Sequence, residues 1–185
     1  MAEEVVLRDG TPAVAWPLLA TDRAALRDGF ASLSPDSRYR RFLSGVPRLS
    51  ESALRVLVDA VDRPDPDDPT PGPVDHVAFV LVALPPDGEE EAVGVARLVR
   101  YPERPDTADV AVTVLDAWQG RGAATALLRV LLGHRPPGTT RLVTQVATGN
   151  AASVAMLARL GRLTSRPAGS GVAEVTVELP PDPAG

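Results

Sequence analysis

The chain has 185 residues, which suits one domain of ordinary size, and its net charge of -5 argues against a general affinity for nucleic-acid phosphates. It contains no cysteine, which excludes disulfides, thiolate metal sites and a cysteine nucleophile. The N-terminus is acidic and no apolar stretch is long enough to span a membrane, so we expect a single-domain cytoplasmic protein without a signal peptide.

The N-terminal part of the chain predicts two short strands and two helices. The strands are expected over residues 4–8 and 13–17, on either side of a turn formed by Asp9 and Gly10. Thr21 is expected to cap a first helix that ends near residue 32. A second helix is expected from Ser34, because serine followed by proline favours a helix start.

This second helix carries several arginines. The interpretation we favour is a solvated face, with Tyr39 and Phe42 packed in the core. The alternative is that the helix contacts an anion or an acidic partner through its arginines, which are Arg38, Arg40 and Arg41.

The middle of the chain predicts a third helix, a loop and three strands. The helix is expected from Ser50, and the loop over residues 63–75, which hold five prolines and four aspartates. Apolar runs then predict strands over residues 76–84, 92–101 and 108–115. Because short turns join these strands, we expect an antiparallel meander.

The last part alternates between helical and extended patterns. Its expected elements are a helix over 122–133, a strand over 141–147, a helix over 150–160 ended by Gly161, a strand over 172–179 and a frayed tail over 180–185. The order predicts an α+β domain with a mixed sheet, in which the meander is followed by helix, strand, helix and strand.

The stretch most informative about chemistry is the junction between the third meander strand and the next helix. Its residues Gln119 to Ala124 open that helix, whose first N–H groups are unpaired and attract an anion such as a pyrophosphate. The chain has no lysine, which excludes a P-loop, and Gly120 and Gly122 follow a meander, which argues against a dinucleotide fold. On the glycines alone, a tight turn without a ligand is the alternative.

Two segments resemble signatures of the GNAT acetyltransferase superfamily. Gln119, Gly122 and Ala124 match the pattern Q-x-x-G-x-A of its acetyl-CoA pyrophosphate loop. Residues 150–161 resemble its second signature helix, although Arg162 replaces the usual phenylalanine that follows. Nearly the whole chain resembles, more narrowly, the catalytic domain of bacterial protein-lysine acetyltransferases, without their cyclic-nucleotide domain. The resemblance implies a GNAT-like mixed central sheet with helices on both sides.

The resemblance also implies the residues that bind acetyl-CoA, and it implies no metal. The backbone of the central strand would hold the pantetheine arm, and the N–H near Val114 would polarise the thioester carbonyl. Asn150 would cap its helix and touch the cofactor. The implied cofactor-binding residues are Val112, Thr113, Val114, Gln119, Gly120, Arg121, Gly122, Ala123, Ala124 and Asn150.

Three further positions bear on catalysis. Asp109 stands where the resembled enzymes carry a glutamate general base, so we expect it to deprotonate the amine through a water, or else only to attract a cation or pair with an arginine. His76 is a second candidate base, with a structural role as its alternative. Leu157 occupies the position at which many of these enzymes place a tyrosine that protonates the leaving thiolate, so that role is vacant.

The function implied is acetyl-CoA-dependent N-acetyl transfer to a primary amine, by direct transfer in a ternary complex. The acceptor is expected to be a protein lysine or a small molecule. The acidic surface of this chain would suit such a cationic acceptor. We expect no nucleic-acid or membrane partner, and a monomer or homodimer. The alternatives are a non-catalytic acyl-CoA-binding regulatory or sensor domain, which Leu157 and the short Asp109 favour, and a structural domain without a cofactor.

Overall fold

The computed structural model describes residues 1–43, 54 and 75–181. The third helix expected from Ser50 therefore lies outside the described residues, apart from Leu54, and so do the loop over 63–75, apart from Asp75, and the tail beyond residue 181. Asp75 is the first residue of a strand and not the end of a loop.

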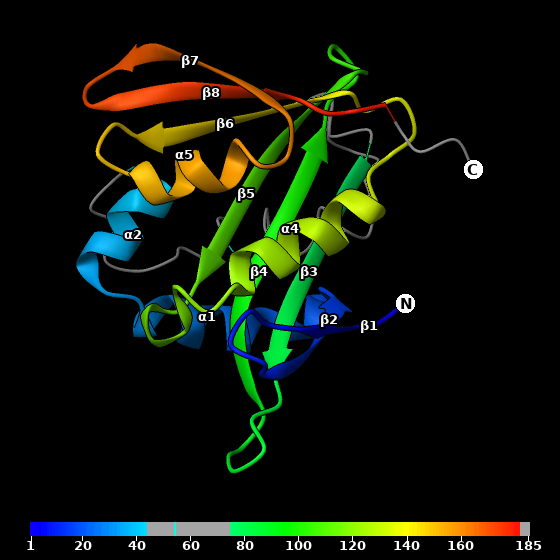
Figure 1. Ribbon diagram of the computed structural model, residues 1–185, viewed down its shortest axis with the longest axis vertical. Helices are drawn as coiled ribbons and strands as arrows, with labels where there is room; N and C mark the ends of the chain where they lie inside the picture. The colour runs from blue at the N-terminus through cyan, green and yellow to red at the C-terminus, as the bar shows by residue number, and fades with distance from the viewer. Residues whose placement is uncertain (44–53, 55–74, 182–185) are drawn as a thin grey trace.

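One sheet of eight strands, in the order β1-β2-β3-β4-β5-β6-β8-β7, forms the centre of the described fold (Figure 1). The predicted mixed sheet is confirmed, because β5 and β6 run parallel while every other neighbouring pair is antiparallel. The strands are β1 (Glu3–Val6), β2 (Pro12–Pro17), β3 (Asp75–Ala83), β4 (Glu91–Arg100), β5 (Thr107–Val114), β6 (Arg141–Ala147), β7 (Arg162–Gly169) and β8 (Val172–Glu178). The expected meander is β3, β4 and β5.

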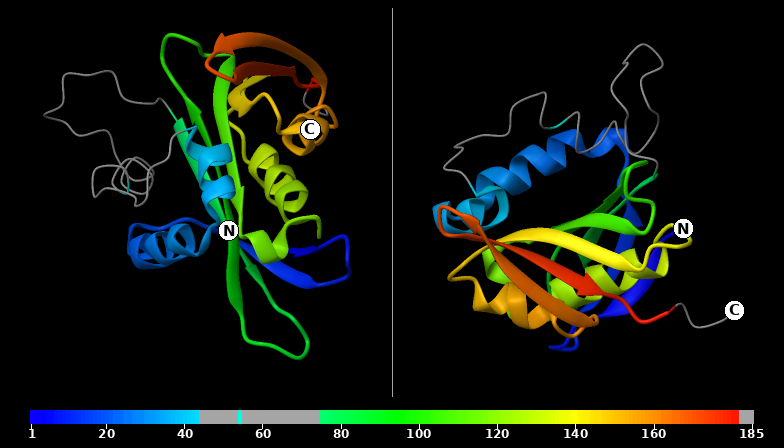
Figure 2. Two further views of the ribbon diagram at one scale, coloured as in Figure 1. Left: turned by 90° about the vertical axis from the view of Figure 1, so that its left-hand side faces the viewer. Right: turned by 90° about the horizontal axis from the view of Figure 1, so that it is seen from above.

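Helices cover both faces of this sheet (Figure 2, left). One face carries α1 (Arg23–Ser32) and α2 (Pro35–Phe42), and the other carries α4 (Ala123–Gly133) and α5 (Ala151–Leu157). The apolar stripe of α4 is buried against β3 and β4, and its central members Leu127 and Leu131 have no exposed surface. The main core thus lies between α4 and the sheet.

The two parallel strands separate soon after they meet. They pair only where Thr107 to Asp109 face Arg141 to Val143, and beyond that point they diverge (Figure 1). From there on, β6 pairs with β8 over its whole length, while β5 keeps pairing with β4. The sheet therefore opens between β5 and β6 on the side where α2 contacts both strands.

Two predicted helix ends differ from the structure. Thr21 does not cap α1, because a short 3-10 turn (Ala20–Asp22) precedes the helix and the Leu19 N–H donates to the Asp22 carboxylate at 2.8 Å. The helix expected to reach residue 160 ends at Leu157, so Gly161 is not its left-handed cap. Gly161 is instead needed for close packing, since a Cβ there would lie 2.0 Å from the Glu178 carbonyl oxygen.

The strand β7 was not predicted from the sequence. Nearly all of its residues are exposed, so it lacks the apolar alternation that marks a half-buried strand. A turn through Gly169, Ser170 and Gly171, all with positive φ, joins it to β8. Ion pairs between the two strands, at Arg162–Glu178 (2.9 Å) and Arg166–Glu174 (2.7 Å), accompany this edge pairing.

Candidate active site

A cleft of about 830 Å³ opens where β5 and β6 separate. Its walls come from the diverging halves of these strands, the start of α4, one side of α2 and one side of α5. All but one of the residues that the sequence assigned to the cofactor line it, the exception being Arg121. Segments far apart in the chain are thus brought to one cavity.

The backbone of β5 offers polar groups to this cleft at every second residue. The Leu115 N–H bonds to the Val93 carbonyl oxygen at 2.9 Å, so the odd-numbered residues of β5 exchange their backbone hydrogen bonds with β4. The N–H and C=O groups of Val112 and Val114 consequently point away from β4, toward the opening. The backbone of Thr113 is directed at β4, which leaves its side chain to line the cleft.

The loop before α4 exposes backbone N–H groups at the cleft. Gly120 and Gly122 have φ values of 74° and 99°, which glycine adopts readily. The Ala126 N–H donates to the Gly122 carbonyl at 2.9 Å, so the three N–H groups before it, from Ala123 to Thr125, have no intrahelical partner. Small side chains and the positive end of the helix dipole make this an anion-binding surface.

An arginine from the N-terminal hairpin lies beside this loop. The Arg8 N–H donates to the Arg121 carbonyl at 2.8 Å, and the Arg8 guanidinium donates to the Gly120 carbonyl. The side chain of Arg121 itself stacks 4.5 Å from the Trp118 ring centre and pairs with Asp9 at 3.7 Å. The positive charge at the mouth of the loop therefore comes from Arg8, which sequence reasoning missed because it is 112 residues from Gly120.

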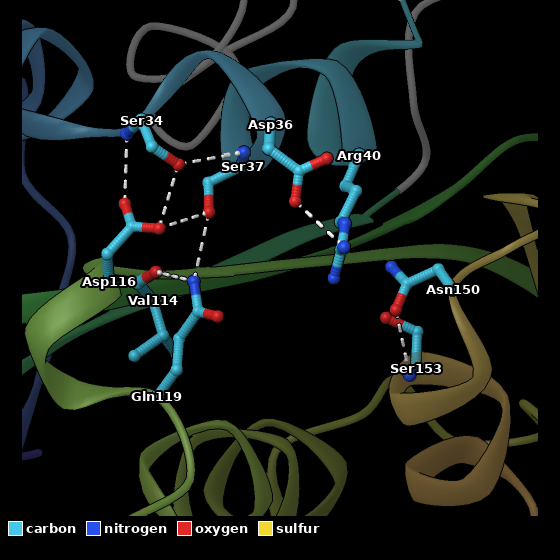
Figure 3. A network of polar contacts seen from close by, with 9 residues as sticks. All are labelled: Ser34, Asp36, Ser37, Arg40, Val114, Asp116, Gln119, Asn150 and Ser153. Atoms are coloured by element: carbon cyan, nitrogen blue, oxygen red, sulfur yellow. Dashed lines mark hydrogen bonds and ion pairs between the residues drawn. The ribbon is translucent and has the colours of Figure 1, made fainter.

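A polar network ties α2 to the same loop (Figure 3). The Asp116 carboxylate accepts hydrogen bonds from the Ser34 N–H (2.9 Å), the Ser34 hydroxyl (2.9 Å) and the Ser37 hydroxyl (2.7 Å). Burial raises the pKa of Asp116, but these hydrogen bonds outweigh it and hold the pKa below its usual value. The Gln119 amide donates to the Ser37 hydroxyl at 3.1 Å and to the Val114 carbonyl at 3.2 Å, which holds its side chain against β5.

Asp109 lies at the point where β5 and β6 part. It is the last residue of β5 that pairs with β6, it lines the cleft, and its side chain is about half exposed. Burial raises its pKa, while the charges of Arg104 and Arg97 lower it to a smaller extent. Its carboxylate is 3.4 Å from the Arg104 guanidinium. A carboxyl with a raised pKa at the base of a cleft suits proton transfer.

His76 lies apart from this position. It pairs with Val99 of β4, which in turn pairs with Asp109, so His76 is two strands away. It is not among the residues that line the cleft. The geometry therefore favours Asp109 over His76 as the group nearest a bound amine.

The start and the middle of α5 also reach the cleft. Asn150 caps the helix as expected, since its side-chain oxygen accepts from the Ser153 N–H at 3.2 Å, and it lines the cleft. Leu157 lines the cleft as an almost fully buried apolar side chain, 4% exposed. It offers no proton to a leaving group.

The cleft is cationic although the chain is acidic as a whole. Two acidic side chains line it, Asp109 and Glu174, against five arginines, which are Arg8, Arg40, Arg41, Arg97 and Arg104. The expectation that Tyr39 lies in the core is wrong, because it is 42% exposed, whereas Arg41 from the same helix turns inward. An overall acidic composition therefore does not describe the local field at the site.

Two kinds of feature are absent from the part of the chain that the structure describes. It holds no helix with the length and apolarity that crossing a membrane requires. It also holds no cluster of three or more histidine, aspartate and glutamate side chains arranged to bind a metal ion.

Comparisons with known proteins point to one family. Residues 18–162 match the family model described as the acetyltransferase (GNAT) domain. The chain is 32% identical over 126 residues to an acetyltransferase of Pseudomonas aeruginosa, covering 68% of this chain and 61% of that protein. It is 31% identical over 168 residues to the acetyltransferase Pat of Mycolicibacterium smegmatis, covering 89% of this chain and 45% of that protein. The chain thus spans less than two thirds of either curated relative.

A solved structure agrees with this assignment. The crystal structure of the GNAT domain of S. lividans PAT superposes with a TM-score of 0.75 and 28% identity, covering 96% of this chain and 97% of that one. The fold expected from the resemblance is therefore confirmed.

Proposed function

The chain belongs to the GNAT acetyltransferase family, and from that premise we propose that it transfers an acetyl group from acetyl-CoA to a primary amine. The observation that carries the proposal is the unpaired start of α4, which faces a cleft between two diverging strands.

The residues present fit acetyl-CoA. The N–H groups from Ala123 to Thr125, with the open backbone at Gly120, would hold the pyrophosphate, and a Cβ at Gly120 would meet nothing within 4 Å. The Val112 N–H and C=O groups and the Val114 C=O group would pair with the amides of the pantetheine arm as a neighbouring strand does, which leaves the Val114 N–H for the thioester. When bound, acetyl-CoA supplies the thioester whose carbonyl carbon the amine attacks.

The chain's own residues would handle the protons and the developing charge. Asp109 accepts, directly or through a water, the proton that the amine loses as its nitrogen bonds to the acetyl carbon. The Val114 N–H donates to the carbonyl oxygen as negative charge grows there. Leu157 has no proton to give when the carbon–sulfur bond breaks, so water supplies the proton to the thiolate. The same apolar position is what favours the second candidate function, an acyl-CoA sensor without turnover.

A charge change at the start of α4 tests the proposal. Thr125 is exposed, lines the cleft and lies in the first turn of α4. In Thr125→Glu the new carboxylate suits the helix dipole, so the fold keeps its stability, but it repels a bound pyrophosphate. A charge about 6 Å from a phosphate is worth roughly 0.7 kcal/mol in water and about 3 kcal/mol near a protein surface, so acetyl-CoA should bind about tenfold more weakly. Thr125→Gln, whose side chain has the shape of glutamate without its charge, should bind acetyl-CoA almost as tightly as the parent does.

The readouts are the acetyl-CoA dissociation constant and the release of free thiol with a panel of amines. Equal affinities of the Glu and Gln variants would place the pyrophosphate elsewhere. Acetyl-CoA binding without turnover on any amine would favour the sensor. Gly122→Glu is a poorer test, because any Cβ at Gly122 would lie 2.8 Å from the Arg8 nitrogen and disturb the hairpin.

A further inference from the structure

Two arginines lie where the cleft meets a second cavity. Arg41 of α2 and Arg97 of β4 line both the cleft and a smaller, mostly apolar cavity of about 200 Å³ between α1 and the sheet. Arg41 stacks on the Phe42 ring, 4.8 Å from its centre. Within the described residues, no hydrogen bond or ion pair engages either guanidinium.

This arrangement is electrostatically unfavourable without a ligand. Burial, and secondarily the charge of Arg97, lowers the pKa of Arg41 to about 10. Burial also lowers the pKa of Arg97, although Tyr101 and Asp109 oppose that shift. Two like charges held near each other and away from water lose hydration, and the attraction of Tyr101 and Asp109 for Arg97 does not fully offset this loss. An anion between them would relieve both losses.

The arginine pair and the candidate base share one face of the sheet. Arg97 lies opposite Ala111 and Asp109 lies opposite Val99, so Arg97 and Asp109 are diagonal neighbours with Cα atoms roughly 7–8 Å apart. This face is the one that α1 and α2 cover, whereas Ala96 and Leu98 point to the α4 side. The pair is therefore on the opposite face from the start of α4, where Arg8 already supplies a positive charge.

We propose that Arg41 and Arg97 bind a carboxylate on the acceptor, so that the acceptor is an apolar amino acid and not a protein lysine. The inference rests on the proposed transfer to an amine. Guanidinium groups match a carboxylate with paired hydrogen bonds. The amine then lies toward Asp109, and the side chain enters the apolar cavity beside Leu26, Phe30 and Val95. A lysine inside a polypeptide carries no carboxylate near its amine and would leave both arginines without a partner.

Binding tests the proposal without turnover. N-acetyl-leucine, the product expected from leucine, should bind at least about tenfold more tightly than its neutral analogue N-acetyl-leucinamide, because a buried charged pair is lost in the amide. Arg97→Gln and Arg41→Gln should each abolish this preference while acetyl-CoA still binds, which also shows that the variants fold. Arg129→Gln, exposed on α4 and outside both cavities, is the matched control and should keep the preference. Both ligands are titrated by calorimetry in the presence and in the absence of coenzyme A. The preference for the carboxylate can then be measured even if the cofactor does not bind.

Turnover assays show whether the bound carboxylate belongs to the acceptor or to the acyl group of the donor. With acetyl-CoA, leucine should give a kcat/KM at least about tenfold above those of leucinamide, isoamylamine and a lysine peptide, and Arg97→Gln should remove that advantage. Equal use of leucine and isoamylamine, or a preference for the peptide, would overturn the proposal. So would an Arg97-dependent gain with succinyl-CoA as donor, because the pair would then serve the acyl group. Failure of acetyl-CoA to bind at all would count against the proposed function. The titration without coenzyme A would still show whether Arg41 and Arg97 bind a carboxylate.

Discussion

Replacing Asp116 by alanine should loosen α2 from the loop that precedes α4. Asp116 is the single acceptor for three hydrogen bonds from Ser34 and Ser37, of 2.7 to 2.9 Å. Each is worth about 0.5–1.5 kcal/mol, and because the three share one exposed carboxylate their sum should be about 1–3 kcal/mol. For a chain of 185 residues this lowers the melting temperature by roughly 2–12 °C. Acetyl-CoA affinity should fall as well, since Gln119 loses the anchored Ser37 hydroxyl.

The assay is urea and thermal unfolding at several pH values, with acetyl-CoA titration at neutral pH. The folded pKa of Asp116 lies below its ordinary value of 3.8, so its contribution is present above that value and disappears as the pH falls through the folded pKa. The difference between parent and variant should therefore shrink below about pH 4. Asp36→Ala is the control, because this exposed acid on α2 makes an ion pair with Arg40 (2.8 Å) that contributes about 0–1 kcal/mol. Equal destabilisation in both variants would refute a stabilising role for the network.

Two further substitutions test separate parts of the reasoning. Gly161→Ala should lower the free energy of unfolding by about 1–3 kcal/mol, because its Cβ collides with the Glu178 carbonyl. Gly161→Asn should lower it at least as much. An Asn variant as stable as the parent in urea unfolding would instead indicate that residue 161 is a left-handed helix cap. Asp109→Asn should slow transfer by about 10²–10⁴-fold and remove the acid limb of the rate profile, and an unchanged limb would assign that limb to another group. Because burial raises the pKa of Asp109, ionisation of this carboxyl lowers the stability of the fold as the pH rises through that pKa. The Asn variant should therefore be more stable than the parent at neutral pH. Below pH 3.8, the ordinary pKa of the carboxyl, the two proteins should be equally stable.

Local patterns were sufficient for most of the described elements and for the glycine-rich start of α4. The start of α2 follows from Ser34 and Pro35, and the Ser34 hydroxyl does accept from the Ser37 N–H at 3.2 Å. The meander and α4 follow from the spacing of apolar residues, because burial of one side of a strand or helix imposes its period on the sequence. The sequence of β7 shows no such apolar period, since this edge strand is almost fully exposed and buries almost no side chains.

The sequence by itself determined the order of most of the described elements, with β7 as an exception, together with the family resemblance and the glycine-rich start of α4, because these depend on residues close together in the chain. Only the tertiary structure placed Arg8 beside the loop and joined Asp116 to α2, since both contacts link segments far apart in sequence. It also decided that Arg41 and Arg97 face one cavity beside Asp109. The direction of a long charged side chain depends on what packs around it and on which strand lies opposite, and neither is encoded in a local pattern.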